Sequence, residues 1–271
     1  MSIDQLQPYY GLSSLPFTRQ IAPGALYRSN AHQEARARIA FLIAQQGIGL
    51  VTGPVGAGKT CAARATAASL DQSRHTLIYL PNPAVGARGI YTQIVTTLGG
   101  QPRFHKATLI PQAEELLHRE RTERHKTVIV ILDEAHLLNP DQLEELRLLT
   151  NAEMDSQSPF CLLLLGQPQL RRRLRLGSFA ALDQRVTLRY ELTGMTPQES
   201  ADYINHHLNL AGRKDRLFTD DALNLIHDAA NGIPRALNNL ATQALVAAYA
   251  QNKGLVDETS ARAAITEVTG E

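Results

Sequence analysis

The chain has 271 residues, of which 44% are hydrophobic and 20% charged, with 27 basic and 26 acidic side chains and a formal net charge of +1. This is ordinary globular composition, and it excludes a disordered chain or a repetitive fibre. The near-neutral charge argues against a protein that coats nucleic acid by bulk electrostatics, although it leaves room for a local basic strip. Cys61 and Cys161 are too isolated to form a disulfide framework or a zinc site.

No segment of the sequence has the length and hydrophobicity of a membrane span. The longest apolar runs, 128–132 and 160–165, fall far short of the roughly 20 residues needed to cross a bilayer. Residues 1–20 lack the basic start and apolar stretch of a signal peptide. We therefore expect a cytoplasmic protein that does not enter a membrane.

The first 190 residues alternate between strand-like and helical patterns. Residues 48–53 predict a buried strand and 61–70 an Ala-rich helix, with a glycine-rich turn between them. Further apolar runs follow at 77–80, 127–133, 160–166 and 186–190. Strands that alternate with helices predict an α/β fold, with a mostly parallel sheet covered by helices on both faces.

After Tyr190 the pattern is helical. A capping box at 196–199 opens a helix to about Leu210, Thr219 can cap a second helix, a third runs over 234–250, and Asp257 can cap a fourth. We expect a small all-α domain over 191–271, joined near Glu191 to an α/β domain over 1–190.

A phosphate-binding loop is predicted between the first strand and the first helix that follows it. The residues of the motif G-x-x-x-x-G-K-[ST] are, in order, Gly53, Pro54, Val55, Gly56, Ala57, Gly58, Lys59 and Thr60, followed by Cys61. Backbone N–H groups of such a loop point at phosphate oxygens, so these nine residues are the expected ATP contacts. Lys59 would bridge the β and γ phosphates and Thr60 would ligate Mg²⁺; the alternative is a plain glycine-rich turn.

Two carboxylates end the apolar strand at 127–133. Acidic groups at the end of a buried strand are costly unless a metal or water uses them, so Asp133 is expected in the Mg²⁺ shell and Glu134 beside the attacking water. Asp-Glu-Ala-His also occurs in helicases, but the chain is too short for two motor domains. We therefore interpret His136 as a local structural residue.

These motifs resemble the AAA+ ATPases, and the resemblance implies three further residues. Arg235, in a Gly-Ile-Pro-Arg helix start, matches the sensor-2 arginine that reaches the γ-phosphate. Arg185 matches the arginine finger that acts on a neighbouring subunit's nucleotide, although it can equally be a surface cation. Gln167 stands at the sensor-1 position, where the family usually has Asn, Ser or Thr; its amide can still donate a hydrogen bond.

Within the AAA+ ATPases, the sequence resembles the ExeA-like branch in particular, over about residues 10–270. The matching sequences are Tyr-Gly-Leu at 10–12, Pro-Phe at 16–17, Leu-Tyr at 26–27, a helix with His32, Leu-Gly-Gln-Pro-Gln-Leu at 165–170 and Gln-Arg-Val at 184–186. By this resemblance Phe17 would border the adenine. The branch includes secretion ATPases and the regulators that select targets for transposases.

The expected function is an ATPase that oligomerises on double-stranded DNA as the partner of a transposase. Secretion members continue into a membrane segment and a cell-wall-binding domain, which this sequence does not show, and we take this to favour transposition. By the resemblance to the transposition regulators, the segment after the second strand would follow the DNA backbone, through Arg88, Arg103, Lys106 and Thr108. Each of these can instead be a solvated surface group.

Several alternatives remain open. The basic run 171–175 can touch DNA or, as we prefer, a neighbouring subunit. The chain can be a secretion or envelope-assembly ATPase that does not bind DNA, or a nucleotide-gated scaffold without turnover. The charge is divided between the domains: residues 1–190 hold 21 basic and 15 acidic side chains (+6), and residues 191–271 hold 6 and 11 (−5).

Overall fold

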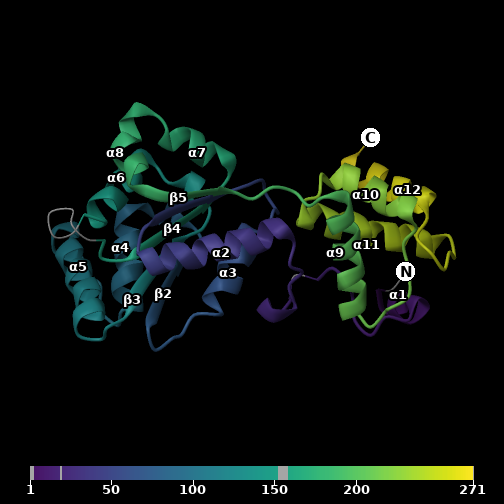
Figure 1. Cartoon of the computed structure of the whole chain (residues 1–271), viewed down its shortest axis with the longest axis horizontal. Coiled ribbons are helices and arrows are strands. Elements are labelled where there is room, and N and C mark those ends of the chain that lie inside the picture. Colours follow the sequence, from purple (N-terminus) through teal and green to yellow (C-terminus); the bar gives the residue numbers. More distant parts are fainter. Residues whose placement is uncertain (1–2, 19, 152–157, 271) are drawn as a thin grey trace. The chain divides into compact units, whose positions relative to one another are not determined.

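The computed structural model describes residues 3–18, 20–151 and 158–270, and its contacts divide the chain into two units. We call Gln33–Val55 with Lys59–Leu192 the α/β unit, and Met1–His32 with Gly56–Gly58 and Thr193–Glu271 the helical unit. Figure 1 labels their helices and strands. No helix of the described residues has the length and apolar character needed to cross a membrane.

The α/β unit contains a five-stranded sheet in the order β2-β3-β4-β1-β5, and every strand pair is parallel. The predicted strands are confirmed, with small changes at their ends. Their bounds are β1 Ile48–Thr52, β2 His75–Leu80, β3 Thr127–Leu132, β4 Cys161–Gly166 and β5 Val186–Glu191. The phosphate loop follows β1 and the two carboxylates follow β3. Because β4 lies between these strands, the segment that follows β4 lies between the phosphate loop and the carboxylates.

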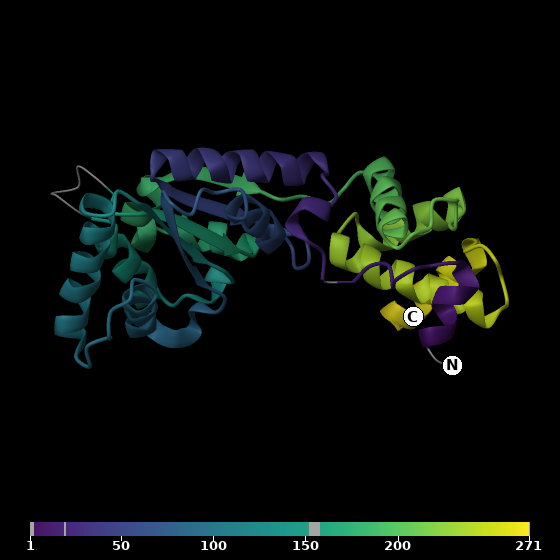
Figure 2. The same cartoon turned by 90° about the horizontal axis from the view of Figure 1, so that it is seen from below.

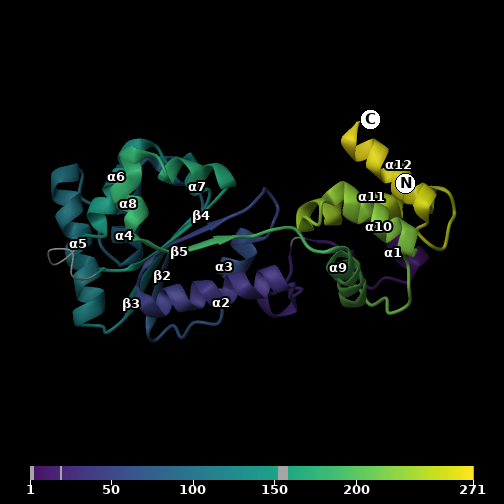
Figure 3. The same ribbon diagram turned by 45° about the horizontal axis from the view of Figure 1, so that its top comes forward.

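Helices cover both faces of this sheet. In Figures 2 and 3, α2 and α3 lie on one face, while α4, α6 and α8 lie on the other. The helices are α2 Asn30–Gln45, α3 Lys59–Ala67, α4 Gly86–Thr97, α5 Lys106–Thr122, α6 Pro140–Leu149, α7 Pro168–Leu174 and α8 Ala180–Arg185. Three-residue 3-10 turns lie at Pro83–Val85 (η2), Ala135–Leu137 (η3) and Gly177–Phe179 (η5).

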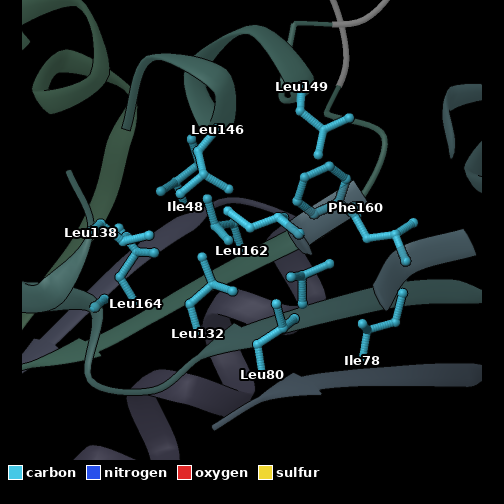
Figure 4. Close-up of a cluster of buried hydrophobic side chains, with 14 of the residues drawn as sticks. Ile48, Ile78, Leu80, Leu132, Leu138, Leu146, Leu149, Phe160, Leu162 and Leu164 are labelled. Atoms are coloured by element: carbon cyan, nitrogen blue, oxygen red, sulfur yellow. The ribbon is translucent and has the colours of Figure 1, made fainter. Parts of the chain in front are cut away.

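Alternate residues of the strands fill the core beneath α4–α8. Along β3, Val128, Val130 and Leu132 belong to this cluster, whereas the intervening Ile129 and Ile131 are buried outside it. Figure 4 shows Leu132 beside Leu80, Leu162 and Leu164 from the neighbouring strands. Burial on both faces explains why β3 and β4 read as continuous apolar runs in the sequence.

In its described residues, the helical unit contains α1 Ile3–Tyr10, the turn η1 Pro23–Ala25, and four long helices. These are α9 Pro197–Leu210, α10 Asp220–Ala230, α11 Pro234–Ala250 and α12 Glu258–Thr269. The predicted caps are confirmed: Thr196 forms a reciprocal capping box with Glu199, Thr219 accepts from Ala222 N, and Asp257 accepts from Ser260 N. These side chains satisfy backbone N–H groups that a helix start leaves without partners.

The N-terminal segment is grouped with the helical unit, whereas the division expected from the sequence kept it with residues 1–190. The Tyr10 hydroxyl donates to the backbone carbonyls of Leu245 (3.3 Å) and Lys253 (3.1 Å). Tyr10, Leu12 and Phe17 are buried in the core of this unit. These contacts join residues more than 200 positions apart (|i−j| = 235 and 243), and no local pattern predicts them.

Candidate active site

The glycine-rich loop between β1 and α3 has the backbone conformation that its composition predicts. Gly56 (φ +84°) and Gly58 (φ +97°) lie in the left-handed region, which favours glycine over residues with a side chain. Lys59, the first residue of α3, is only 7% exposed, and its Nζ donates to the carbonyls of Gly53 and Pro54, both at 2.9 Å. The loop therefore brings its lysine and the N-terminus of α3 to the carboxyl edge of the sheet.

The carboxylate of Asp133 is held at the same edge by hydrogen bonds to both of its oxygens. Its Oδ2 accepts from the hydroxyls of Thr60 (2.6 Å) and Tyr79 (3.0 Å), and its Oδ1 accepts from Glu134 N (2.9 Å). The side chain is nearly buried, with the residue 5% exposed. Burial, followed by the nearby charge and hydrogen bond of Asp133, raises the pKa of Tyr79 to about 12, so this hydroxyl remains a donor.

The donor set at this edge fits Mg²⁺. Thr60 and Asp133 offer a hydroxyl and a carboxylate in direct contact, and Mg²⁺ prefers few protein oxygens together with water and substrate phosphates. Among the residues that the structure describes, no group of three His, Cys, Asp or Glu side chains forms an all-protein metal site.

Glu134 contrasts with its neighbour in both backbone and surroundings. It adopts φ +51° and ψ 34°, an uncommon conformation for a residue with a side chain and one that concentrates at functional sites. Its side chain is 50% exposed, and its Oε2 lies 3.3 Å from His136 Nδ1. The carboxylate is therefore directed away from the core, where a water can reach it.

Gln167 lies immediately after β4 at the N-cap position of α7, but its side chain makes no capping bond. Its Nε2 instead lies 3.0 Å from His136 Nε2. The predicted sensor residue and the predicted structural histidine are thus in contact, beside Glu134.

The sequence interpretation missed Tyr79 as part of this site. It lies at the carboxyl end of β2, and the carboxyl ends of parallel strands meet at one edge of the sheet. Since β2 is the neighbour of β3 only through the strand order, no local signal in the sequence indicated this contact.

The two predicted arginines have defined places in the structure. Arg185 ends α8, and its Nη1 donates to Arg147 O (3.2 Å) and Thr150 Oγ1 (3.5 Å) at the C-terminal end of α6. Within the helical unit, Arg235 lies in the first turn of α11, and its backbone N donates to Gly56 O at 3.4 Å. Their action on a nucleotide stays a prediction.

Phe17 is 7% exposed and stacks on His207, with ring centroids 5.5 Å apart. Its ring thus belongs to the core of the helical unit, and contact with an adenine stays a prediction. Burial, helped by the neighbouring His206, lowers the pKa of His207 to about 4, so this imidazole is neutral at pH 7.

The four predicted DNA-contact residues lie at the start of two neighbouring helices. Arg88 is in the first turn of α4, and Arg103, Lys106 and Thr108 belong to the exposed segment 101–108 at the start of α5. The Arg88 guanidinium lies 5.3 Å above the ring of Phe104, which is 78% exposed. Lys106 pairs with Glu145, and the Thr108 hydroxyl donates to His105 O.

Part of the basic run 171–175 is used inside the chain. Arg171 pairs with Glu191 at 2.9 Å, and Arg173 donates to the carbonyls of His136 (3.3 Å) and Leu138. Burial lowers the pKa of Arg173. Arg172 and Arg175 are exposed, so contact with a neighbouring subunit or with DNA stays a prediction for these two residues.

The parallel sheet, the glycine-rich loop and the adjoining carboxylates define a P-loop protein with the AAA+ fold. Residues 43–174 match the family model described as "AAA domain". The chain is 33% identical over 267 residues to General secretion pathway protein A of Aeromonas hydrophila. That alignment covers 97% of this chain and 48% of the relative, so the chain spans about half of the relative's length. Residues 43–174 are thus similar to the AAA domain family, and nearly the whole chain is similar to about half of this secretion protein, at 33% identity.

Solved structures share the fold at low sequence identity. Cdc6p from Pyrobaculum aerophilum has a TM-score of 0.68 at 17% identity, covering 89% of this chain and 67% of that one. The Aeropyrum pernix ORC1 protein in complex with DNA has a TM-score of 0.65 at 18% identity, covering 97% and 68%. The Thermotoga maritima RuvB branch migration motor has a TM-score of 0.56 at 19% identity, covering 88% and 68%.

Proposed function

We propose that this protein is a Mg²⁺-dependent ATPase. The observation that carries the proposal is the 2.6 Å hydrogen bond from Thr60 to Asp133, which joins the end of the phosphate loop to the carboxylate after β3. Loop and carboxylate come from distant parts of the sequence, and P-loop ATPases use both for one metal. Mg²⁺, when bound, neutralises charge on the phosphates; Thr60 and Asp133 would hold it.

The chain's own residues supply the other steps. The loop amides and Lys59 bind the phosphates, while Glu134 orients a water and accepts its proton as the water oxygen attacks the γ-phosphorus. The bond to the β–γ bridging oxygen breaks, and the products are ADP and phosphate. The exposed, strained position of Glu134 supports this role.

Phosphate release from Mg²⁺-ATP tests the proposal. Lys59→Ala should abolish turnover, while Lys214→Ala, which removes an exposed lysine of the helical unit, should not. A wild-type protein that binds ATP but releases no phosphate would instead indicate a nucleotide-gated scaffold.

We further propose that ATP assembles the protein on double-stranded DNA and that it serves a transposase as a target-selecting partner. The exposed Arg88, whose guanidinium lies over the Phe104 ring, and the exposed Arg103 and Lys106 support contact with the phosphate backbone without base reading. ORC1 of Aeropyrum pernix, which shares the fold, was solved in complex with DNA. An oligomer repeats a weak contact many times and so binds DNA well.

In that assembly Arg185 would act on the nucleotide of the neighbouring subunit and Arg235 on that of its own. Hydrolysis would then dismantle the oligomer, as a timer.

Binding to a DNA duplex across a range of salt concentrations, with and without a nonhydrolysable ATP analogue, tests the DNA proposal. The double variant Arg88→Ala/Lys106→Ala should reduce the slope of log affinity against log salt by about 1 for each DNA phosphate that a subunit no longer neutralises. The matched control, Lys214→Ala/Arg262→Ala, removes two cations from the helical unit and should leave the slope unchanged.

A second candidate is a secretion or envelope-assembly ATPase that does not bind DNA. The 33% identity to General secretion pathway protein A, over 97% of this chain, favours it. A protein that hydrolyses ATP but is not retained on DNA, with or without the analogue, would establish this candidate over the DNA-binding one.

A further inference from the structure

Three polar side chains form a chain of contacts beside the loop that binds phosphate. Gln167 Nε2 lies 3.0 Å from His136 Nε2, and His136 Nδ1 lies 3.3 Å from Glu134 Oε2. The residues meet because β4 and β3 are neighbours in the sheet, so the segments that follow them share one edge. His136 therefore links the predicted sensor residue to the predicted catalytic carboxylate.

The chemistry of these atoms gives the contacts a direction. An amide nitrogen can only donate, so His136 Nε2 accepts from Gln167. A neutral imidazole carries one N–H, which must then be on Nδ1, the nitrogen that faces Glu134. In this arrangement the amide of Gln167 fixes the tautomer, and the tautomer offers a hydrogen to the carboxylate.

The ring of His136 is fixed in place, whereas its contact with Glu134 is loose. Its side chain is 7% exposed, and Arg173 donates to its backbone carbonyl and to that of Leu138, which fixes the turn that carries the ring. Among the described residues, the buried Nδ1 has no aligned hydrogen-bond partner, although Glu134 Oε2 is near. The ring is thus fixed, while the half-exposed Glu134 can approach it or leave it.

We propose that His136 is a positioning residue that transmits the orientation of the Gln167 amide to Glu134 through its tautomer. This inference rests on the proposed ATPase function. In the proposed step the Gln167 amide rotates, so that its Nε2 faces a phosphate or water oxygen and its carbonyl oxygen faces His136 Nε2. That nitrogen must then gain a proton from water while Nδ1 loses one, so the ring stays neutral.

The consequence for Glu134 follows from the lone pair left on Nδ1. A lone pair facing a carboxylate is repulsive, so Glu134 leaves His136 and becomes available to the attacking water. With the opposite amide orientation, the Nδ1 hydrogen attracts the carboxylate and restrains it. Glu134 is thereby restrained until Gln167 is engaged, and hydrolysis waits for the nucleotide to be correctly placed.

The first test observes the tautomer directly. The full-length wild-type protein, labelled with ¹⁵N-histidine, is studied by NMR with no nucleotide and with Mg²⁺ and a nonhydrolysable ATP analogue; His136→Asn identifies the resonance. The expected result is Nδ1–H without nucleotide and Nε2–H with the analogue. The same tautomer in both states overturns the inference.

The second test measures coupling in turnover. His136→Asn keeps an amide donor near Glu134 but loses the link to Gln167, so kcat should fall while KM for ATP is unchanged. Combined with Gln167→Leu, the double variant should have a kcat within about threefold of the worse single variant, because the two residues act through one path. Multiplicative losses overturn the inference. If His136→Asn does not fold, the wild-type spectra decide, with the resonance assigned through His136→Gln.

The two levels of the proposal fail in different ways. A wild-type protein that releases no phosphate contradicts the ATPase function and this inference together. A wild-type protein that hydrolyses ATP, but in which His136 keeps one tautomer, contradicts the inference alone.

Discussion

Buried polar side chains differ in kind between the two units. In the described part of the α/β unit they include the ionisable Lys59, Asp133 and Glu120, and the first two lie at one edge of the sheet. In the described part of the helical unit they are serines and histidines, such as Ser200 and His207, held within the helix packing. Burying a charge is costly, so the pair Lys59 and Asp133 at one edge of the sheet indicates chemistry, whereas Glu120 is neutralised by an ion pair with Arg124. The neutral groups of the helical unit serve packing and caps. Substitutions at the sheet edge around Lys59 and Asp133 should therefore change activity, whereas substitutions of the buried polar side chains of the helical unit should change stability.

Among the variants that keep nucleotide binding, Glu134→Gln should have the largest effect. The change keeps the shape but removes the base, so kcat should fall about 10²–10⁴-fold, with nucleotide binding retained. Phosphate release under steady-state conditions measures kcat, and equilibrium nucleotide binding measures the affinity. The assembled state on DNA should persist, and a monomeric protein in sedimentation with ATP and DNA would contradict the timer.

A matched control for this variant is Glu144→Gln, an exposed glutamate paired with Arg147. It should leave kcat unchanged. Equal losses in both variants would show that the effect of Glu134→Gln is not specific to the site.

The helical unit should show the next effect, as a dependence of stability on pH. The pKa of His207 is lowered to about 4 in the folded protein. Between pH 6.5 and 4 this imidazole therefore binds a proton in the unfolded chain but stays unprotonated in the folded chain. The contribution of His207 to the free energy of unfolding is fully present above pH 6.5 and is lost as the pH falls toward 4. The loss amounts to about 3 kcal/mol. Denaturant unfolding at pH values between 7 and 4 measures it.

His207→Gln should flatten this dependence, whereas His118→Gln, at an exposed position, should keep it. A full pH slope in His207→Gln would assign the effect to other groups and weaken the contrast between the units.

Tyr79→Phe removes one of the two hydroxyl donors to Asp133 Oδ2. Partners of a metal-ligating carboxylate commonly contribute tenfold or more to metal affinity, so the Mg²⁺ concentration for half-maximal turnover should rise about tenfold. Tyr190→Phe, whose hydroxyl contacts Glu34 and not Asp133, is the control. An unchanged Mg²⁺ requirement would remove Tyr79 from the site.

The smallest effect should come from Thr196→Ala, which removes the capping box of α9. The expected loss is about 1 kcal/mol in the free energy of unfolding, with turnover unchanged. Thr242→Ala, in the exposed interior of α11, removes a hydroxyl of the same kind without a capping role. A loss of turnover without a loss of stability in Thr196→Ala would reverse the contrast between the units.

Much of this architecture follows from local sequence signals. Strands buried on both faces read as apolar runs, and the caps at Thr196, Thr219 and Asp257 mark helix starts within a residue. The motifs at 53–60 and 133–134 are likewise local, and a hydrogen bond between Thr60 and Asp133 joins them in the structure.

The features that local signals do not predict depend on strand order and on distant contacts. Tyr79 and His136 enter the site through neighbours across the sheet, and the sequence alone indicates only a structural role for His136. The N-terminal segment packs with the helical unit through Tyr10 and Phe17, which no periodicity indicates. In the basic run 171–175, Arg171 and Arg173 have partners inside the chain. A high density of charge in the sequence therefore does not by itself indicate an interface.

The strand order also determines when the phosphate loop can form during synthesis. The strand that precedes the loop pairs with β4 and β5, and Ile48 lies beside Leu162 and Val186. β2 and β3 pair with each other much earlier, with His75 beside Thr127. A nascent chain that ends before β4 therefore has its glycine-rich loop attached to an unpaired strand. Nucleotide binding during translation should begin only after most of the α/β unit has left the ribosome.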